Sequence, residues 1–265
     1  MTKTGERFKK LYSELGLIDN DGEMLTLHSD CQNFSYCWQN IQNRKPENDG
    51  FWTITRPWIG QKYSELELLV IAINMNEYGS YEGAINLIEQ TKVEIEQGRR
   101  KMFVSDTYSG TFLFHRMGSY VTAFAEKAEL LKPTWIEDYP SPPDIVSALE
   151  FISYTNHVKC SPTGEKSKPS YQMWERCGNF ILKPEIELLS PKRLLVLGNS
   201  DNFYYLNHNV LDTEIALKWQ GKIGIGNGYI NKKSIEIFVV PHPASFGGNS
   251  SEIMNDLNQV LNADD

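Results

Sequence analysis

Four short, mostly apolar segments, separated by stretches with helical periodicity, constrain the fold of this 265-residue chain more than any other feature. These segments are 67–73 (ELLVIAI), 149–156 (LEFISYTN), 193–198 (RLLVLG) and 234–240 (SIEIFVV). Short apolar runs with little polar alternation are typical of strands buried on both faces of a sheet. Strands that alternate with helices form parallel sheets, because each parallel connection needs a crossover. We therefore predict an α/β/α sandwich around a central, mostly parallel four-stranded sheet.

The periodic stretches between these strands predict the helices. They are expected at 5–15, 82–100, 112–126, 170–189 and 251–262, with a helix or loop-helix at 28–44. The Pro-rich stretch 132–144 predicts a loop in which Asp144 caps a short helix. The glycine-rich stretch 221–228 (GKIGIGNG) precedes a strand and is interpreted as a turn. No change in composition divides the chain, so we predict a single domain over 1–265, with a helical N-terminal part over 1–50.

Composition excludes several classes of protein. The net charge of −8 argues against a protein that coats nucleic acid through bulk charge, although 157–193 carries seven basic and four acidic residues. No apolar run reaches the length of about 20 residues that a membrane helix needs. The N-terminus, MTKTGERFKK, lacks the apolar region of a secretory signal, so we expect a cytoplasmic protein. We also expect the protein to be a monomer. Four cysteines in such a chain favour a metal site or catalysis over disulfides.

Asn or His follows the end of every predicted strand. Asn74 comes after the first strand, Asn156 ends the second, Asn199 follows the third, and His242 follows the fourth within Pro-His-Pro. Parallel sheets bind their ligands beyond the carboxyl ends of the strands, so these side chains are the candidate site. Amides and imidazoles bind other amides and oxyanions without carrying a fixed charge. No strand leads into G-x-G-x-x-G or a phosphate loop, which argues against a dinucleotide or NTP enzyme.

The segment 154–198 resembles the central block of the uracil-DNA glycosylase superfamily, and most closely its iron–sulfur branch, family 4. Its strand ends in Asn and is followed by K-C-S-P, a Gly with a basic residue, a second Cys and a helix that leads into L-G. The stretch 239–245 (VVPHPAS) resembles the family's H-P-A/S loop. IAINMN in the first strand and GTFLFHRMGSY at 110–120 resemble two further motifs, so the resemblance runs from about residue 30 to 250.

The resemblance implies an enzyme that flips a base out of DNA and hydrolyses its N-glycosidic bond. His242 would donate a hydrogen bond to the pyrimidine O2, where negative charge develops, and Asn74 would position the attacking water. Family 4 enzymes have an acid near that position, and Glu77 is the carboxylate available here. The alternatives are a loop histidine held between prolines and an Asn that caps a helix or turn.

Three further residues are assigned to the base by the same resemblance. Asn156 would read the base edge, because an amide offers both a donor and an acceptor. Phe112 or Phe114 would stack on the flipped base. The alternatives are an Asn that merely ends a strand and aromatic side chains of the core.

The four cysteines form a second constellation. Cys160 and Cys177 stand where the family's iron–sulfur ligands stand, and Cys31 and Cys37 precede the first strand as the family's first pair does. The resemblance therefore implies a 4Fe–4S cluster held by four thiolates. The spacing of the first pair departs from the family, because five residues separate the two cysteines where the family has two. A zinc site built from the same thiolates and free buried thiols remain the alternatives.

Basic residues are expected to bind DNA phosphates locally. Lys166, Lys168 and Ser245 are assigned to this role, together with 99–101, Lys232 and Lys233. Ordinary solvated charge is the alternative.

Departures from the family motifs indicate the substrate. The first motif lacks its Pro and its acid, the stretch from Asn76 to Gly110 is enlarged, and the loop after HPAS, FGGNSSE, lacks the family's Arg. In this family the first motif lies near the 5-position of the base. We hypothesise a glycosylase for a bulky modified pyrimidine, such as glucosylated hydroxymethylcytosine of phage DNA, and hence a role in anti-phage defence. Excision of uracil, a catalytically inactive DNA-binding module and a zinc-bound α/β protein unrelated to DNA are the alternatives.

Overall fold

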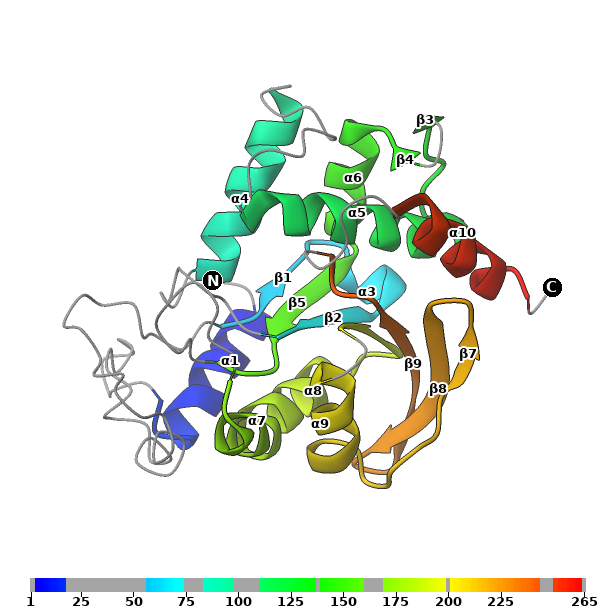
Figure 1. The fold of residues 1–265 in the computed structure, drawn as a ribbon. Coiled ribbons are helices and arrows are strands. Elements are labelled where there is room, and N and C mark those ends of the chain that lie inside the picture. Colours follow the sequence, from blue (N-terminus) through cyan, green and yellow to red (C-terminus); the bar gives the residue numbers. More distant parts are fainter. Residues whose placement is uncertain are drawn as a thin grey trace.

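A computed structural model describes most of the chain and is shown as a ribbon in Figure 1. The described residues are 3–17, 56–73, 83–97, 110–136, 139–159, 169–198, 201–243 and 250–263. The helix or loop-helix predicted at 28–44 lies outside these ranges. Within them, no helix combines the length and the apolar character that crossing a membrane requires.

The sheet at the centre has seven strands in the order β1-β5-β2-β6-β9-β8-β7. In that order they are Trp58–Ile59, Ile152–Asn156, Leu68–Ala72, Arg193–Leu197, Lys233–Val240, Ile223–Ile230 and Lys218–Gln220. The four predicted strands are β5, β2, β6 and β9, and they pair with one another in parallel. The prediction of a mostly parallel α/β sheet is therefore confirmed. A small separate sheet pairs β3 (Trp135–Ile136) with β4 (Tyr139–Pro140).

The prediction of four strands is wrong, because antiparallel strands extend both edges. β1 pairs with β5 at one edge, and the β7–β8 hairpin pairs with β9 at the other. The turn predicted at 221–228 is mostly strand β8. A Cβ at Gly224 would lie 2.8 Å from Leu217 Cδ1, and one at Gly226 would lie 2.8 Å from Ile215 Cδ1. These glycines therefore make room for the neighbouring segment within a strand.

Most of the predicted helices are present. The helices, in chain order, are α1 Lys3–Glu14, α3 Tyr63–Leu66, α4 Gly83–Glu96, α5 Gly110–Lys127, α6 Pro142–Leu149, α7 Tyr171–Cys177, η2 Gly178–Leu182, α8 Lys183–Leu189, α9 Asp201–Asn209 and α10 Ser250–Leu261. The element η2 is a π-helical turn between α7 and α8, so the helix predicted at 170–189 is continuous. The predictions at 5–15, 82–100, 112–126 and 251–262 are also confirmed.

The loop predicted at 132–144 is only partly correct, because it contains β3 and β4 and leads into α6. Ser141 is the N-cap residue of α6, and Asp144 lies in the first turn. The Asp144 carboxylate accepts hydrogen bonds from the Ser141 hydroxyl and from the Thr134 backbone N–H at 2.8 Å. Asp144 thus fastens the incoming chain to the helix but does not cap it.

Helices cover both faces of the sheet, as Figure 1 shows. The core on one face is shared with α4, α5, α6 and α10, and the core on the other with α1, α7, α8 and α9. In β2, Leu68, Val70 and Ala72 belong to the first core, and Leu69 and Ile71 belong to the second. All five are buried, which confirms the prediction of a strand covered on both faces.

The parallel strands are connected in two directions. After β2 the chain passes through α4, α5 and α6 on one face and returns as β5 on one side of β2. After β5 it passes through α7 and α8 on the other face and returns as β6 on the opposite side of β2. After β6 the chain enters α9, which packs in the core of that second face. The connections that leave β2 and β6 therefore diverge to opposite faces. Such a switch point opens a crevice at the carboxyl ends of the two strands.

A buried ion pair joins the end of β5 to the helices below it. Lys159 Nζ donates to Glu185 Oε2 at 2.5 Å, and both side chains are fully inaccessible. The Thr155 hydroxyl donates to the same oxygen at 2.9 Å, and the Tyr12 hydroxyl donates to Glu185 Oε1. Burial lowers the pKa of Lys159, and the Glu185 carboxylate opposes that shift. The pair therefore depends on both partners, because either charge alone would be buried without compensation.

Removal of one partner is expected to be far more costly than removal of both. Glu185→Ala should lower the free energy of unfolding by about 3–5 kcal/mol, because it leaves the Lys159 ammonium buried and unpaired. The double variant Lys159→Met/Glu185→Leu should lose much less. Lys183→Ala, which breaks the half-exposed pair with Asp212, serves as the control and should cost about 1 kcal/mol or less. Urea unfolding measures all three, and equal losses for Glu185→Ala and Lys183→Ala would contradict the interpretation.

Candidate active site

Gly198, directly after β6, is the point at which the ends of three parallel strands meet. Its φ of +110° is a conformation that side-chain-bearing residues rarely adopt. A Cβ placed there would lie 3.6 Å from Ile73 Cδ1, 3.7 Å from Asn202 Cβ and 3.9 Å from His242 Cβ. The structure therefore brings the residues that follow β2, β6 and β9 together at the switch point.

Asn202, in the first turn of α9, binds the strand ends at this point through its side chain. Its side chain is fully buried, and its Nδ2 donates to Ile71 O and to Leu197 O, each at 3.0 Å. The first carbonyl belongs to β2 and the second to β6. The pairing of β2 with β6 ends at Ile71 and Val196. Because the ladder between the two strands ends there, the Asn202 amide supplies the N–H donors for these two carbonyls.

His157, the residue after β5, completes the same network. Its Nδ1 lies 3.0 Å from Asn202 Oδ1, and its ring meets Trp174 edge to face at 4.7 Å between centroids. Because Asn202 uses its nitrogen for the two carbonyls, Nδ1 of His157 carries the proton and donates. Burial lowers the pKa of His157 to about 3, so the ring is neutral at pH 7. His157 is thus a structural residue that fixes the end of β5 beside β2 and β6.

Asn156, the predicted reader of the base edge, lies buried at the end of β5. The Tyr154 hydroxyl donates to its Oδ1 at 3.2 Å. Tyr154 stands two residues earlier in the same strand, so both side chains are on the same face of the sheet. This bond sets the orientation of the amide, with Oδ1 toward Tyr154, and leaves Nδ2 to donate elsewhere.

His242 is half-buried in the loop that follows β9, between the buried residues Pro241 and Pro243. Arg116 of α5 donates through Nη1 to Pro243 O at 2.6 Å, so the loop is held by a helix as well as by its prolines. Burial lowers the pKa of His242 to about 4. At pH 7 the imidazole is therefore neutral, with one N–H to donate and one nitrogen to accept.

Cys177 is a buried thiol at the last residue of α7. Its Sγ accepts a hydrogen bond from the Lys159 backbone N–H at 3.5 Å. Lys159 directly precedes Cys160 in the sequence. The backbone therefore contacts Cys177 at the residue directly before Cys160, the cysteine that is predicted to bind the same cluster. Backbone N–H donors to sulfur are a feature of protein-bound iron–sulfur clusters, so the surroundings of Cys177 fit such a ligand.

The other predicted site residues lie outside the described part. For Phe112 and Phe114 the structure gives the backbone, within α5, but not the side chains. The remaining residues are Asn74, Glu77, Lys166, Lys168, Ser245, Cys31, Cys37 and Cys160. Their assigned roles stay predictions, as do the roles of Asn156, His242 and Cys177.

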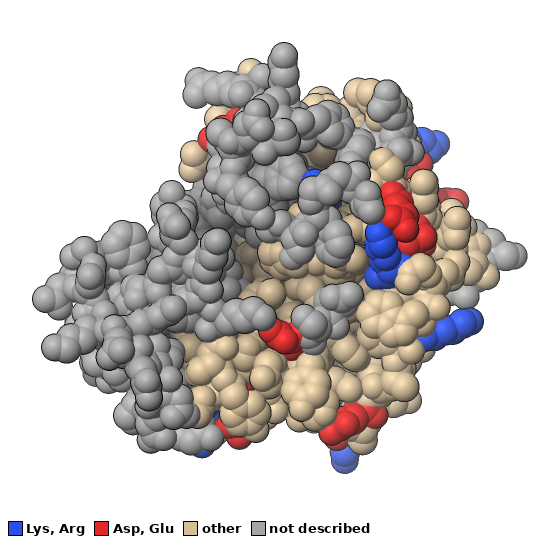
Figure 2. Space-filling model, in the orientation of Figure 1, with Lys and Arg blue, Asp and Glu red and all other residues tan. Residues whose placement is uncertain are grey.

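The local excess of basic residues at 157–193 does not form an open basic surface in the described part. Lys159 is buried, and the other described lysines and arginines have acidic or aromatic partners. The pairs are Lys183–Asp212, Lys192–Glu67, Arg193–Glu236 and Arg176 over the Phe180 ring. In Figure 2 most blue groups of the described surface likewise lie beside red ones. The described cations of 157–193 are therefore buried or already paired.

Lys232 and Lys233 do not belong to the same edge as His242. They stand at the start of β9, whereas His242 follows its end, eight strand residues later. At about 3.3 Å per residue the two ends of this strand are about 23 Å apart. Lys233 Nζ donates there to the Ser190 hydroxyl at 3.0 Å. The assignment of these lysines to DNA phosphates stays a prediction, and any phosphate that they bind lies far from His242.

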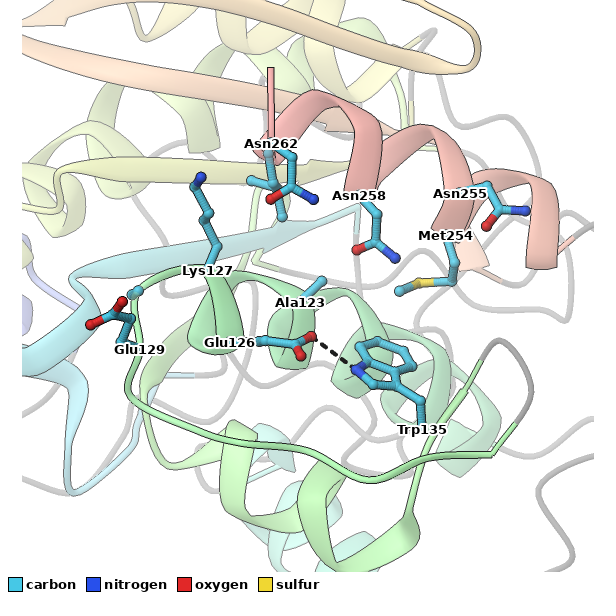
Figure 3. Close-up of a pocket in the computed structure, with 11 residues that line it drawn as sticks. Ala123, Glu126, Lys127, Glu129, Trp135, Met254, Asn255, Asn258 and Asn262 are labelled. Atoms are coloured by element: carbon cyan, nitrogen blue, oxygen red, sulfur yellow. Dashed lines mark hydrogen bonds between the residues drawn. The ribbon is translucent and has the colours of Figure 1, made fainter. Parts of the chain in front are cut away.

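A separate cleft of about 790 Å³ lies between α5 and α10, as Figure 3 shows. Trp135 and Glu126 lie side by side among its lining residues, and Trp135 Nε1 donates to Glu126 Oε2 at 2.9 Å. Glu126 is ten residues beyond Arg116 along α5, about 15 Å at the rise of a helix. Because Arg116 holds the His242 loop, this cleft is distinct from the site at the strand ends.

Three residues of the site escaped the sequence analysis. Asn202 follows the end of β6 by five residues. Polar residues are common at the N-terminus of a helix, so nothing in the sequence assigned it another role. Tyr154 alternates with Asn156, and this spacing of two was the one available signal that their side chains share a face. Arg116 acts on a loop far away in the sequence, which no local pattern reveals.

Substitution of Asn202 should loosen the strand ends. Asn202→Ala leaves two buried carbonyls and the His157 N–H without a partner, and we expect a loss of about 3 kcal/mol in the free energy of unfolding. Asn207→Ala is the matched control on the same helix, because Asn207 also makes two backbone bonds, both to Ile215. Amide exchange at Gly198 and His157 should accelerate in Asn202→Ala and stay unchanged in Asn207→Ala. Equal exchange in both variants would contradict the role of Asn202.

Comparisons with known proteins agree with this geometry. The family model of the Uracil DNA glycosylase superfamily matches residues 97–264, a stretch that covers more than half of the chain and includes β5, β6, β9 and the Pro-His-Pro loop. No curated protein matches the chain. Membership of this superfamily points to a DNA glycosylase, a hydrolase that acts on DNA. The chain belongs to the uracil-DNA glycosylase superfamily.

Proposed function

We propose that the protein is a DNA glycosylase that takes a flipped base into the crevice above β2 and β6 and hydrolyses its N-glycosidic bond. The observation that carries this proposal is the neutral His242, held by two buried prolines and Arg116 at the strand end next to Gly198. Asn156 and His242 end β5 and β9, and β2 and β6 lie between them. Three strand spacings of about 4.8 Å separate these ends, which leaves room for one base between the two side chains.

The reaction divides charge between the sugar and the base. As the bond from C1′ to the base nitrogen breaks, positive charge develops on the sugar and the electron pair leaves with the base. The N–H of His242 would donate to the pyrimidine O2 and stabilise the departing anion. Because the imidazole is neutral at pH 7, it donates this bond through its single N–H. The water oxygen bonds to C1′, and a general base accepts the proton that the water loses. An abasic site remains.

Asn156 and the residues after β2 would supply the other roles. Asn156 keeps Nδ2 free of the Tyr154 bond, so the amide can donate to an acceptor on the base edge. Asn74 would orient the water, with Glu77 as the nearby carboxylate, and Phe112 or Phe114 would stack on the base. These assignments rest on the sequence motifs.

For the substrate we propose a pyrimidine with a bulky 5-substituent, such as glucosylated hydroxymethylcytosine of phage DNA, with uracil as the alternative. The altered IAINMN motif and the enlarged stretch from Asn76 to Gly110 support this choice. The protein would then act in the cytoplasm, as a monomer, against phage DNA.

We also place the protein in the iron–sulfur branch of the superfamily. Cys31, Cys37, Cys160 and Cys177 would hold a 4Fe–4S cluster, and the buried, N–H-bonded thiol of Cys177 supports this set. The cluster would tie the N-terminal part of the chain to α7. It would serve a structural role, because hydrolysis moves no electrons.

Base release from a panel of DNA substrates tests the proposed function. The panel holds oligonucleotides with uracil, a thymine mismatch or hypoxanthine, and phage DNA with glucosylated or unglucosylated hydroxymethylcytosine. Alkali-labile sites should appear in one of these substrates. His242→Ala should lower the rate about 100-fold or more, and His242→Gln, which keeps an N–H donor, should lose less.

Two outcomes of that assay would change the assignment. Release from uracil alone would remove the bulky pyrimidine and leave a uracil enzyme. No release from any substrate, by folded protein that retains its metal, would instead indicate a DNA-binding module without catalysis.

Metal analysis of the purified protein tests the cluster separately from activity. We expect broad visible absorption and about four iron and four sulfide per chain, the content of one such cluster. Cys177→Ser should lose the absorption, whereas the nearby Tyr171→Phe should retain it. A colourless protein with stoichiometric zinc, or with no metal, would overturn the proposal.

A further inference from the structure

Three tyrosines form an aromatic surface on the first turns of α7 and α9, which lie next to each other in Figure 1. We refer to Tyr171, Tyr204 and Tyr205 as the tyrosine platform. Tyr171 is 55% exposed and Tyr204 is 52% exposed, while Tyr205 is half-buried between them. The ring centroid of Tyr205 lies 5.9 Å from that of Tyr171 and 5.0 Å from that of Tyr204.

Ring contacts connect this platform to the candidate active site. Tyr205 stacks on Trp174 with centroids 5.0 Å apart and planes 17° from parallel. Trp174 in turn meets the edge of His157, the residue that directly follows Asn156. On α9, Tyr204 is two residues beyond Asn202, which binds the ends of β2 and β6. The platform therefore adjoins the carboxyl edge of the sheet.

We propose that the tyrosine platform binds single-stranded DNA next to the flipped nucleotide by stacking on its bases. This inference rests on the proposed function, because it assumes that DNA lies at the carboxyl edge. His208 stacks on the Tyr204 ring with centroids 4.1 Å apart, and Tyr204 remains 52% exposed. An exposed aromatic ring is a sequence-tolerant partner for a base, since every base has a π-face. Exposed aromatic side chains that gather on one surface indicate a binding site.

The surrounding charges that the structure describes give DNA phosphates no attraction to the platform, so base stacking would have to supply the binding. Burial raises the pKa of Tyr205, and the Asp201 carboxylate raises it further. Glu214 Oε2 lies 3.5 Å from Nε2 of His208, which is in α9. Arg176, the described cation on α7, lies over the Phe180 ring. Carboxylates beside the tyrosines repel phosphates but not uncharged bases. Binding at this surface should therefore depend weakly on salt.

Fluorescence anisotropy with a labelled oligothymidylate of about ten nucleotides tests the inference on the full-length protein. A strand of the same length made of tetrahydrofuran spacers, which has phosphates but no bases, is the comparison. The test variant is Tyr171→Ala/Tyr204→Ala, and Tyr171→Phe/Tyr204→Phe keeps the rings without the hydroxyls. Tyr229→Ala is the matched control, because Tyr229 is 49% exposed near the β8–β9 turn, at the opposite end of the sheet.

The double alanine variant should bind oligothymidylate at least about tenfold more weakly, while its salt dependence stays that of the unmodified protein. The double phenylalanine variant and Tyr229→Ala should bind normally, and the spacer strand should bind weakly and equally to all proteins. Unchanged binding by the double alanine variant would overturn the inference, and the surface would then be left for a protein partner. A loss that reduces the salt slope, or that affects the spacer strand equally, would also overturn it.

The outcome is separable from that of the proposed function. If the tyrosine variants lose binding and no substrate releases a base, then the platform stands and the glycosylase assignment fails. If base release depends on His242 while the tyrosine variants bind and react normally, then the glycosylase stands and the platform fails.

Discussion

The pairing of β2 with β6 ends at Ile71 and Val196, and the amide of Asn202 donates to the carbonyls of Ile71 and Leu197 at this point. A buried carbonyl without a donor destabilises the folded state, so an opening at this place requires a donor from elsewhere. Because Asn202 also accepts from His157, one side chain fixes the ends of β2, β5 and β6 relative to one another. The relative placement of these strand ends depends on this arrangement.

The groups around the crevice are neutral or paired. His242 and His157 are neutral at pH 7 because burial lowers the pKa of each, and Lys159 is matched by Glu185 inside the protein. A site of oriented neutral donors stabilises a negative charge that appears only during the reaction, without attracting anions beforehand. This property agrees with base excision, in which the leaving base becomes an anion.

The sequence predicted the parallel core of the fold but not its edges. The apolar runs that became β2, β5, β6 and β9 carry a strong signal, because strands covered on both faces leave little choice of side chain. The glycines of β8 led to the prediction of a turn. Ile215 and Leu217, which fill the space beside them, become their neighbours only in the folded structure. Lys159 is one of the basic residues of 157–193, and its burial beside Glu185 does not follow from the sequence because that partner stands 26 residues away.

The sequence by itself determined the fold class, the strand ends at which polar side chains occur, and the family motifs around Asn156 and His242. These are local properties, set by hydrophobic pattern and by residue identity. Only the tertiary structure decided which ends meet at Gly198, which cations are compensated, and which partners orient the functional groups: Tyr154 for Asn156 and Arg116 for the His242 loop. Hydrogen bonds and burial depend on distances between residues that are remote in the chain, and a linear pattern does not contain those distances.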